Sequence, residues 1–483
     1  MASQMQATTS HTEISRRGIF STDHEMFRTT VRRFIEREIL PFHAAWEQAG
    51  LIPREVWRKA GRAGLLLPMA AAEYGGGGGD FLHTAIDLSA VLMGPYATQI
   101  FGDHGADVIK IESPEGDSTR WIGPGRHPGM GPLFLHLNRN KRSVALDLKS
   151  PQGAAAMRHL IEGADVFVHN LRPASIERLG LDYERVSAIN PRIIWCGVYG
   201  YGEDGPYAGR PAYDDLIQGA VGIAALQQRS GASEPRYVPL TIADRMVGLH
   251  AAHSVAMALY GRERTGRGCR IDVPMFETMA SVVLSDHLYG RTFEPPSGDT
   301  GYVRLLSPGR RPYETSNGYI CALVYNDGHW QRFLHAIERD DLRVDPRFAD
   351  LASRTRHIDE VYGFLGQTLR GESTAHWLAL FEQIDVPAVP LNTIESLLDD
   401  PHLAAVGFFQ QVEHPSEGTM RTFGAPARWE GYDVGKLAPA PRLGEHTESV
   451  LRECGFDASA LASLLASGAA VPVAADAGVA VEV

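Results

Sequence analysis

The sequence contains little cysteine and no long apolar run. Four cysteines occur in 483 residues, and none of them forms a CxxC pair. This spacing argues against both a zinc site and a disulfide scaffold, so we expect a reducing, cytoplasmic setting. No apolar stretch approaches the roughly 18 residues of a membrane-spanning helix, and the polar N-terminus lacks the apolar core of a secretory signal. We therefore expect no contact with a membrane.

Basic charge and metal-binding motifs are scarce as well. The formal net charge is -12, which leaves no broad basic face for nucleic acid. The 19 histidines show no HExxH spacing, so no metal is expected. No GxGxxG follows the first predicted strand, which argues against a dinucleotide site of that kind. An apolar fraction of 44% and a charged fraction of 22% are typical of globular proteins.

The N-terminal part is predicted to be helical. Residues 1–19 are rich in Ser, Thr and Gln and are expected to form a disordered tail. Thr22 and Glu25 have capping-box spacing and start a helix that Pro41 ends. A second helix is expected from Pro53 to about Ala63. The helical unit, residues 20–82, includes a run of five glycines at 75–79, which can be a phosphate loop, a linker or a seam.

Beyond the glycines, short apolar runs alternate with helical patterns. Strands are predicted at 86–89, 106–112, 165–169 and 193–198, and helices at 95–104, 153–162 and 175–179. Repeated βα units favour an α/β fold with a doubly wound, mostly parallel sheet. Residues 242–260 form a predicted helix that is apolar on nearly every side, so we expect it to be buried.

A second, smaller α/β domain is predicted where the composition becomes loop-like, near residue 294. A hairpin is expected within 312–325, with helices at 329–336, 358–369 and 374–383. The predicted division is a first part of the large domain at 83–290, a small domain at 291–400, a return segment at 401–468 and a loose tail at 469–483.

Asp244 is the first candidate for chemistry. It stands in the first turn of the predicted 242–260 helix, where an aspartate ordinarily caps the helix. The alternative is a nucleophilic carboxylate that the helix amides keep ionised. Such a carboxylate can attack a thioester and form a mixed anhydride.

Two cation-rich stretches, 138–149 and 169–180, are either solvated loops or a cradle for a polyphosphate cofactor. Asn170 lies just past a predicted strand, where open α/β sheets bind ligands. Tyr213 is more often a packed aromatic residue than a catalytic one.

From about residue 85 to about 468 the chain resembles the class III coenzyme A transferases, the CaiB/BaiF family of formyl-CoA and carnitine CoA transferases. The resemblance rests on stretches in the same order along the chain: DLSAVLMGPYATQIFGDHGADVIKIESPEGD, NRNKRSVALDLKSPQG, ADVFVHNLRPASIERLGLDYE, NPRIIWCGVYGYGEDGP, AYDDLIQGAVG, ADRMVGLHAA, TGRGCRIDVPMFE, VPAVPLNTIESLLDDP and PRLGEHT.

This resemblance implies a function, and it implies roles for particular residues. Asp244 would be the catalytic carboxylate, which takes the acyl group of an acyl-CoA as an anhydride and then carries CoA as an aspartyl thioester to a carboxylic acid. The positions that match the CoA-binding set are Asn170, Arg178, Lys149, Val91, Gly94 and Tyr213. The implied fold is a Rossmann-like large domain built from both chain ends, plus a smaller domain. Two such chains would interlock as a homodimer.

The family also includes 2-methylacyl-CoA racemases, which carry a histidine in a GHD motif. Here that position reads Ala212-Tyr213-Asp214, and a tyrosine, with a pKa near 10, is a poor base at neutral pH. Two further departures concern formyl-CoA transferases. Arg310 and Arg311 replace glycines of their flap, and Leu92 replaces a glutamine. We therefore expect an acid larger than formate or oxalate.

Residues 20–82 resemble the first helices of an acyl-CoA dehydrogenase, ending in EYGGGGGD. The flavin-binding and C-terminal parts of that family are missing, so no FAD and no dehydrogenation are expected. The glycines then mark a seam, with the splice between about residues 80 and 86. The stretch FLHTAIDLS replaces the usual first strand of the transferases. A third hypothesis is therefore a catalytically silent fusion whose first strand does not pair.

Overall fold

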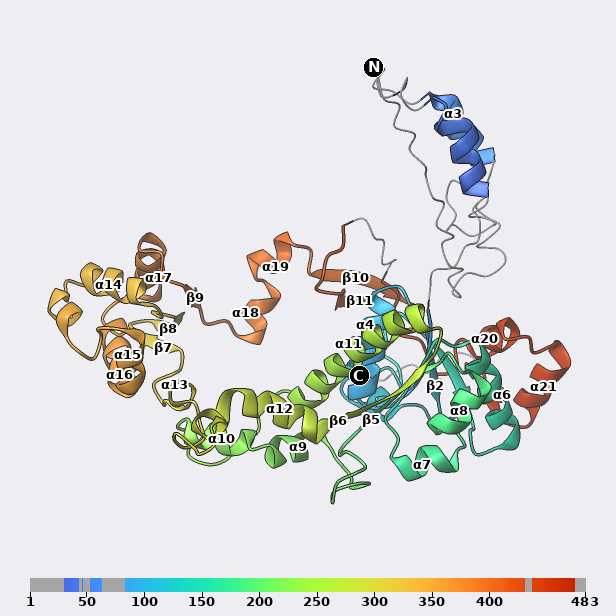
Figure 1. Ribbon diagram of the computed structural model, residues 1–483, viewed down its shortest axis with the longest axis horizontal. Coiled ribbons are helices and arrows are strands. Elements are labelled where there is room, and N and C mark those ends of the chain that lie inside the picture. The colour runs from blue at the N-terminus through green and yellow to red at the C-terminus, as the bar shows by residue number, and fades with distance from the viewer. Residues whose placement is uncertain (1–29, 43–45, 47–52, 63–82, 431–436, 474–483) are drawn as a thin grey trace, which may run out of the picture.

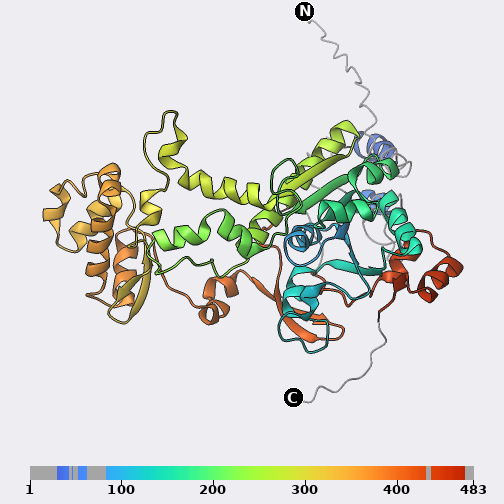
Figure 2. The ribbon, with the colours of Figure 1, turned by 90° about the horizontal axis from the view of Figure 1, so that it is seen from below.

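The computed structural model describes residues 30–42, 46, 53–62, 83–430 and 437–473. Figures 1 and 2 show an elongated molecule, with a larger domain around one sheet and a smaller domain at the opposite end. Long helices and extended segments join the two domains. The predicted tail at 1–19, the five glycines and residues 474–483 of the predicted loose tail at 469–483 lie outside the described residues. The first residues of that predicted C-terminal tail are not loose, because Ala470 and Val471 form a strand that pairs with Leu146 and Ala145.

The N-terminal extension is helical where it is described. Residues 30–34 continue into the π-helix η1 (Ile35–Ile39), and the chain turns at Leu40 to Phe42. Helix α3 (Arg54–Arg62) follows. An ion pair of 2.6 Å between Lys59 Nζ and Glu38 Oε2 joins the two segments. The predicted stop at Pro41 is confirmed, whereas the predicted start at Thr22 lies outside the described residues.

The larger domain is built on a seven-stranded sheet of order β12-β3-β2-β1-β4-β5-β6. Six of the strands pair in parallel, and β12 runs antiparallel to β3. The predicted doubly wound, mostly parallel sheet is thus confirmed. The strands are β1 (Thr84–Leu88), β2 (Asp107–Glu112), β3 (Lys141–Leu146), β4 (Val166–His169), β5 (Ile194–Tyr199), β6 (Cys269–Pro274) and β12 (Ala470–Val471).

The altered first strand pairs on both of its edges. Thr84 to Asp87 align with β2, and Ala85 to Leu88 align with β4. Ala85 and Ile86 are buried, as a central strand with both faces covered requires. The hypothesis of a silent fusion whose first strand does not pair is therefore wrong in its structural premise.

Helices cover both faces of this sheet. One core, centred on Phe167 and Trp195, packs against the helices α6 (Pro151–Gly163), α7 (Pro173–Arg178), α8 (Tyr183–Ile189), α20 (Thr447–Glu453) and α21 (Ala458–Ala466). The other core, centred on Val168 and Cys196, packs against α4 (Met93–Asp103), α9 (Asp214–Ala220), α11 (Ile242–Thr265) and α12 (Met275–His287). Because α20, α21 and β12 return to the sheet, both ends of the transferase-like part build the larger domain.

Helix α11 is buried on one side only, which corrects the expectation of burial all round. Ala251 and Val255 contact the core and have exposed fractions of 1% or less, while Leu249, Met257 and Tyr260 are 45%, 70% and 67% exposed. The helix leaves the end of the sheet, so only one of its faces has the larger domain to pack against (Figure 2).

The smaller domain has its own sheet and core, as predicted. Strands β7 (Tyr313–Thr315), β8 (Gly318–Ala322) and β9 (Ala388–Pro390) form an antiparallel sheet. Around Phe333 and Trp377 pack the helices α14 (Asp327–Ala336), α15 (Leu351–Arg356), α16 (Ile358–Leu369), α17 (Thr374–Gln383) and the 3₁₀ helix η5 (Asp340–Val344).

The remaining elements are short and lie in connections or near the edge of the large sheet. They are η3 (Ser118–Trp121), α5 (Pro132–Leu137), α10 (Ile223–Arg229), η4 (Tyr289–Thr292), α13 (Val303–Leu306), α18 (Ile394–Leu398), α19 (Pro401–Ala405), β10 (Phe409–His414) and β11 (Gly418–Phe423). The last two form an antiparallel hairpin. The hairpin predicted within 312–325 is formed by β7 and β8.

Candidate active site

The candidate site lies at the carboxyl ends of β1 and β4, where the strand order reverses. Open α/β sheets bind ligands at such a switch point because the chains leaving the two strands diverge there. Asn170 follows β4 directly and joins the two ends. Its side-chain Nδ2 donates to the Ala90 carbonyl at 2.7 Å, and its Oδ1 accepts from the Ala90 amide at 3.0 Å.

The turn between β1 and α4 is held in a strained shape. Val91 has φ of 70°, which is unfavourable for a β-branched residue. Its amide donates to the carboxylate of Asp117 at 3.3 Å. Three residues later, a Cβ on Gly94 would lie 2.3 Å from the Ser89 Cβ. The close approach of the helix to the turn therefore requires glycine at position 94.

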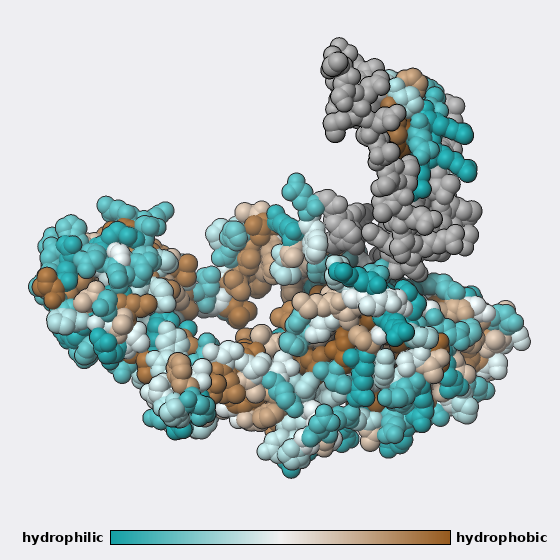
Figure 3. Space-filling model, viewed as in Figure 1, coloured by the Kyte–Doolittle hydropathy of each residue, from teal (hydrophilic) through white to brown (hydrophobic). Residues whose placement is uncertain are grey.

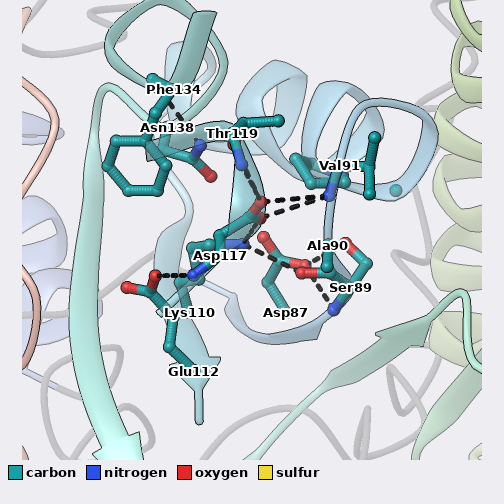
Figure 4. Close-up of polar contacts among 12 residues, drawn as sticks. Asp87, Ser89, Ala90, Val91, Lys110, Glu112, Asp117, Thr119, Phe134 and Asn138 are labelled. Carbon is teal, nitrogen blue, oxygen red and sulfur yellow. Dashed lines mark hydrogen bonds and ion pairs between the residues drawn. The ribbon is translucent and has the colours of Figure 1, made fainter. Parts of the chain in front are cut away.

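A buried ionic network supports the turn from below (Figure 4). Lys110 on β2 pairs with Asp117 at 3.0 Å and donates to the Ser89 carbonyl at 2.9 Å. Asp87 on β1 accepts from the Ser89 amide at 3.0 Å and pairs with Lys141 at 2.9 Å. Side chains thus hold the main chain at three successive positions, from Ser89 to Val91.

Paired charges stabilise this network, although it lies in the interior. Burial alone would raise the pKa of Asp87, but Lys141 and Lys110 lower it below its usual range. Burial opposes the charge of Lys110, yet Asp87, Asp117 and Glu112 raise its pKa. Burial lowers the pKa of Lys141 to about 8 against the pull of Asp87. At neutral pH these groups stay charged and hold one another in place.

The cation-rich stretch 138–149 is therefore for the most part not a solvated loop. It contains strand β3, in which Lys141 faces the interior and pairs with Asp87. Arg139 pairs with Asp103 at 2.6 Å, also in the interior. The reason is that buried aspartates on neighbouring elements neutralise these cations. Lys149, three residues past β3, is exposed.

The other predicted CoA-binding cation also lies on the surface. Arg178 is the last residue of α7, is exposed, and donates from Nη2 to Ser175 Oγ at 3.3 Å. Lys149 and Arg178 both follow strands that end at the carboxyl edge of the sheet. Both side chains are exposed to solvent, and exposed cations can bind a polyphosphate without burying its charge.

Asp244 approaches the same edge on helix α11. This helix joins β5 to β6, which are parallel, so its N-terminus lies at the carboxyl edge. One turn beyond Asp244, a Cβ on Gly248 would lie 2.7 Å from the Met93 carbonyl and 3.1 Å from the Tyr96 ring. Since residues four apart share a helix face, Asp244 lies on the face that packs against the start of α4.

The surroundings of Asp244 differ from those expected for a capping residue. Thr241 precedes the helix, and the Asp244 amide donates to Asp214 Oδ1 at 3.0 Å. In the described part of the chain its carboxylate accepts no hydrogen bond. Burial and the Asp214 charge raise the pKa of Asp244 to about 7, against Arg245. The expectation that helix amides keep this group ionised is wrong, because burial and a like charge outweigh them.

Asp214 was missed by the sequence reasoning, although it directly follows Tyr213. It is 7% exposed and accepts from Gln218 Nε2 at 2.6 Å. Gln218 in turn accepts from the Val238 amide at 2.9 Å, which fixes the segment leading into α11. Tyr213 itself is 67% exposed, and no described residue bonds to its hydroxyl. In the sequence, the two adjacent aspartates after Tyr213, Asp214 and Asp215, could have indicated that an acidic group lies near the site.

The Asp244 carboxylate accepts no hydrogen bond from a described residue, and its raised pKa makes the ionised form more basic. Arg245, whose guanidinium carbon lies 4.6 Å from the centre of the Tyr96 ring, supplies positive charge beside it. Near neutral pH about half of the groups are ionised.

A cavity with a volume of about 1270 Å³ lies elsewhere in the molecule, between the segment 289–308 and residues 355–360. None of the predicted site residues lines it. In the described ranges, no three His, Cys, Asp or Glu side chains are arranged to hold a metal ion. Likewise, none of the helices described is long and apolar enough to span a membrane.

Comparison with known proteins decides the family. Residues 83–447 match the model of CoA-transferase family III. The chain belongs to this family.

Relatives of this transferase carry related activities in their names. The succinate–glutarate CoA-transferase of Agrobacterium fabrum is 32% identical over 381 residues, which cover 76% of this chain and 94% of the relative. An acyl-CoA transferase of Fusarium pseudograminearum is 33% identical, covering 79% and 86%. Among solved structures, a CaiB/BaiF family protein from Brucella suis is 31% identical with a TM-score of 0.65, covering 78% and 98%.

A second match concerns the N-terminus of the transferase. Residues 21–104 match the model of the acyl-CoA dehydrogenase N-terminal domain, as the resemblance of residues 20–82 implied. The two matches overlap at 83–104. In the structure this overlap is β1 and α4, which are integral parts of the transferase sheet.

Proposed function

We propose that this CoA-transferase moves CoA from an acyl-CoA to a free carboxylic acid through Asp244. The Asp244 carboxylate attacks the thioester carbonyl, the C–S bond breaks, and an aspartyl anhydride forms with release of CoA thiolate. The thiolate then attacks the aspartyl carbonyl, which frees the donor acid and leaves an aspartyl-CoA thioester.

The second half of the cycle repeats these steps in reverse order. The acceptor carboxylate attacks the aspartyl thioester and expels the CoA thiolate, giving a new anhydride. The thiolate attacks the acceptor acyl carbonyl, which yields the new acyl-CoA and regenerates the Asp244 carboxylate. Each step exchanges one acyl bond for another, so neither an oxidant nor water is needed.

The observation that carries this proposal is the state of Asp244. Its carboxylate is partly buried, accepts no hydrogen bond from the described residues and has its pKa raised to about 7. Asp244 lies against the start of α4. This helix carries Gly94 and follows the turn that carries Val91, and both residues belong to the CoA-binding set implied by the family resemblance. A carboxylate serving only as a helix cap would instead accept bonds from main-chain amides.

The remaining predicted residues are proposed to hold CoA. Val91 and Gly94 shape the turn at the thioester end, and Lys149 and Arg178 meet the phosphates. Asn170 uses one N–H and one lone pair on Ala90, which leaves its second N–H for the cofactor. Tyr213, exposed beside Asp214, completes the proposed set.

For the acids, we propose short dicarboxylates such as succinate and glutarate. The names of two relatives support this choice, and both acids are larger than formate or oxalate. Leu92, which replaces the glutamine of formyl-CoA transferases, is 7% exposed at the turn. Its side chain offers an apolar contact to a methylene chain rather than a hydrogen bond to a small acyl group.

A homodimer is proposed as the working form. Figure 3 shows apolar residues gathered over the middle of the molecule, along α11 and α12 and beside α18. Met257 and Tyr260 on α11 and Leu284 on α12 are exposed. A surface of this kind on a folded chain is typical of an interface. The free cysteines fit the proposed cytoplasmic setting.

The dehydrogenase-like N-terminus is proposed to be a fusion that adds no flavin chemistry. The proposed division keeps a helical unit at 20–82, a large domain at 83–290 and 401–468, and a small domain at 291–400. A flavin absorbance band in the purified protein would contradict the proposal that the N-terminus adds no flavin chemistry. Limited proteolysis at the proposed boundaries tests the division into domains.

The experiment that tests the function is mass spectrometry after mixing with succinyl-CoA. We expect a CoA or acyl adduct on the peptide that contains Asp244. With glutarate added, we expect transfer of CoA from succinyl-CoA to glutarate, which gives glutaryl-CoA and succinate. Asp244→Ala should lose both, while Asp215→Ala, an exposed neighbour of Asp214, should keep both. Loss of a 2-proton from a 2-methylacyl-CoA without CoA exchange would instead support the racemase.

A further inference from the structure

The smaller domain contains a separate pocket of about 500 Å³ with an unusual distribution of charge. Three arginines line it, and not one of its lining residues is acidic. The full lining is Arg304, Arg310, Arg311, Pro312, Tyr313, Cys321, Ala322, Leu323, Val324, Tyr362, Leu365, Pro387, Ala388 and Val389. We call it the arginine pocket.

The acidic residues nearest in sequence have other partners. Glu314 follows Tyr313 but pairs with Arg370 at 3.0 Å, and Asp359 on α16 accepts from Ser307 Oγ at 2.5 Å. Within the described ranges, the three pocket arginines form no ion pair with an acid. In a chain with a formal net charge of -12, such an unneutralised cluster is a local site of positive potential.

Two tyrosines, Tyr313 and Tyr362, line the pocket together with the arginines. Burial raises the pKa of Tyr362, and Arg304 and Arg310 act against it. Burial also raises the pKa of Tyr313, and there Arg304 and Arg311 act against it. Arg304 acts to lower the pKa of both tyrosines. Its side chain is half-buried, and its guanidinium carbon lies 5.1 Å from the centre of the Tyr325 ring. All three arginines therefore lie around one pocket.

The other walls of the pocket are apolar. Val324 and Leu365 are 4% and 1% exposed, while Leu323 and Val389 present 43% and 59% of their surface. A ligand that fits both parts has an anionic head for the guanidinium groups and a short hydrocarbon body for the walls. Guanidinium groups bind carboxylates in a bidentate, planar geometry.

We propose that the arginine pocket is a binding site for a small organic carboxylate, distinct from the Asp244 site. Arg304 and the adjacent pair Arg310 and Arg311 bind the carboxylate, and Val324 and Leu365 contact the hydrocarbon part. An inorganic phosphate satisfies the arginines alone and leaves the apolar walls in water, so it should bind more weakly. The inference does not depend on the proposed CoA transfer.

Arginine footprinting on the full chain tests the location. Phenylglyoxal modifies accessible guanidinium groups, and peptide mass spectrometry reports each site. Glutarate should slow modification of the peptide carrying Arg304, Arg310 and Arg311 at least fivefold. Modification of Arg370 and Arg343, which pair with acids outside the pocket, should not change. Equal rates at the pocket with and without glutarate would overturn the proposal.

Calorimetric titration with glutarate, butyrate and inorganic phosphate tests the ligand class. Arg304→Gln should weaken glutarate binding at least tenfold, and Arg370→Gln less than twofold. Tighter binding of phosphate than of glutarate and butyrate would overturn the assignment to a carboxylate. Circular dichroism checks that Arg304→Gln is folded. If the folded variant binds glutarate as tightly as the wild type does, the proposed binding site is wrong. Transfer activity is measured separately with Asp244→Ala, so failure of either proposal is recognised independently.

Discussion

Asp87 and Asp244 belong to the same domain and lie near the same edge of its sheet, yet their surroundings shift the pKa in opposite directions. Asp87 is fully buried, but Lys141 and Lys110 lower its pKa below the usual range. Asp244 is less buried, and burial together with Asp214 raises its pKa to about 7. Burial is therefore not what separates a structural carboxylate from a reactive one. The sign of the nearest charge and the presence of hydrogen-bond donors decide it.

The largest expected effect is on the stability of the paired aspartate. Lys141→Met removes the pair with Asp87 and bonds to Pro95 and Asn138. Because a buried charge then loses its main partner, the free energy of unfolding should fall by about 3–5 kcal/mol, as measured by urea denaturation. Arg142→Met, which breaks pairs that are partly exposed, should cost about 1 kcal/mol or less. If the free energy of unfolding falls by similar amounts in the two variants, the buried network contributes no more to stability than a partly exposed ion pair.

Next in size is the effect on the turn that the network supports. Asp117→Asn keeps an acceptor for the Val91 amide but removes the charge that pairs with Lys110. A shifted turn should misplace the thioester carbonyl and lower kcat about 10- to 100-fold, with KM for the acyl-CoA changed little because the exposed cations Lys149 and Arg178 are intact. Steady-state kinetics separates the two constants.

The control for the turn is Asp103→Asn, which breaks the buried pair with Arg139 near the far end of α4. This variant should lose stability and keep its kcat. If both variants lose kcat equally, the role assigned to Asp117 is wrong and the loss reflects general destabilisation.

Replacing the unpaired aspartate should stabilise the protein. The folded pKa of Asp244, about 7, lies above the unfolded value near 3.9. The ionised form is therefore disfavoured in the fold, and stability from this group falls as the pH rises from about 4 to 7. Asp244→Asn should raise the free energy of unfolding by about 1–2 kcal/mol at pH 8, discounted for partial exposure, and by little at pH 4. Asp87→Asn should lower the free energy of unfolding at pH 8, because the fold favours the ionised form of Asp87.

The smallest expected effect is a shift of the pH profile. In the proposed mechanism Asp244 reacts as the ionised carboxylate, so kcat/KM for transfer should rise with pH through an apparent pKa near 7. Asp214→Asn removes the like charge and keeps an oxygen for the Asp244 amide, so the profile should move about one unit toward acid. A profile unchanged in this variant would mean that burial alone sets the pKa of Asp244.

Local patterns predicted the regular structure well. The alternation of apolar runs and helical patterns located the parallel strands β1, β2, β4 and β5 and most helices of the smaller domain to within a few residues. Strand β3 was missed because its first residues, Lys141 and Arg142, read as a solvated loop. A strand pattern does not reveal that a lysine faces a buried aspartate 54 residues away.

For the candidate site, the resemblance assigned Asp244, Asn170 and the β1–α4 turn their roles, and the fold brings them to one edge. The contribution of Asp214 was not predicted. It is separated from Asp244 by 30 residues, and only the packing of α9 against α11 places its charge next to the reactive carboxylate.

The sequence alone determined the fold class, the family and the position of the carboxylate, because periodicity and motif order are local properties of the chain. The tertiary structure decided which charges are neutralised. It pairs Lys141 with Asp87, leaves the three arginines of the small domain without acidic partners, and sets Asp214 beside Asp244. Coulomb interactions depend on distance in space and on burial, and neither quantity is written in the order of the residues.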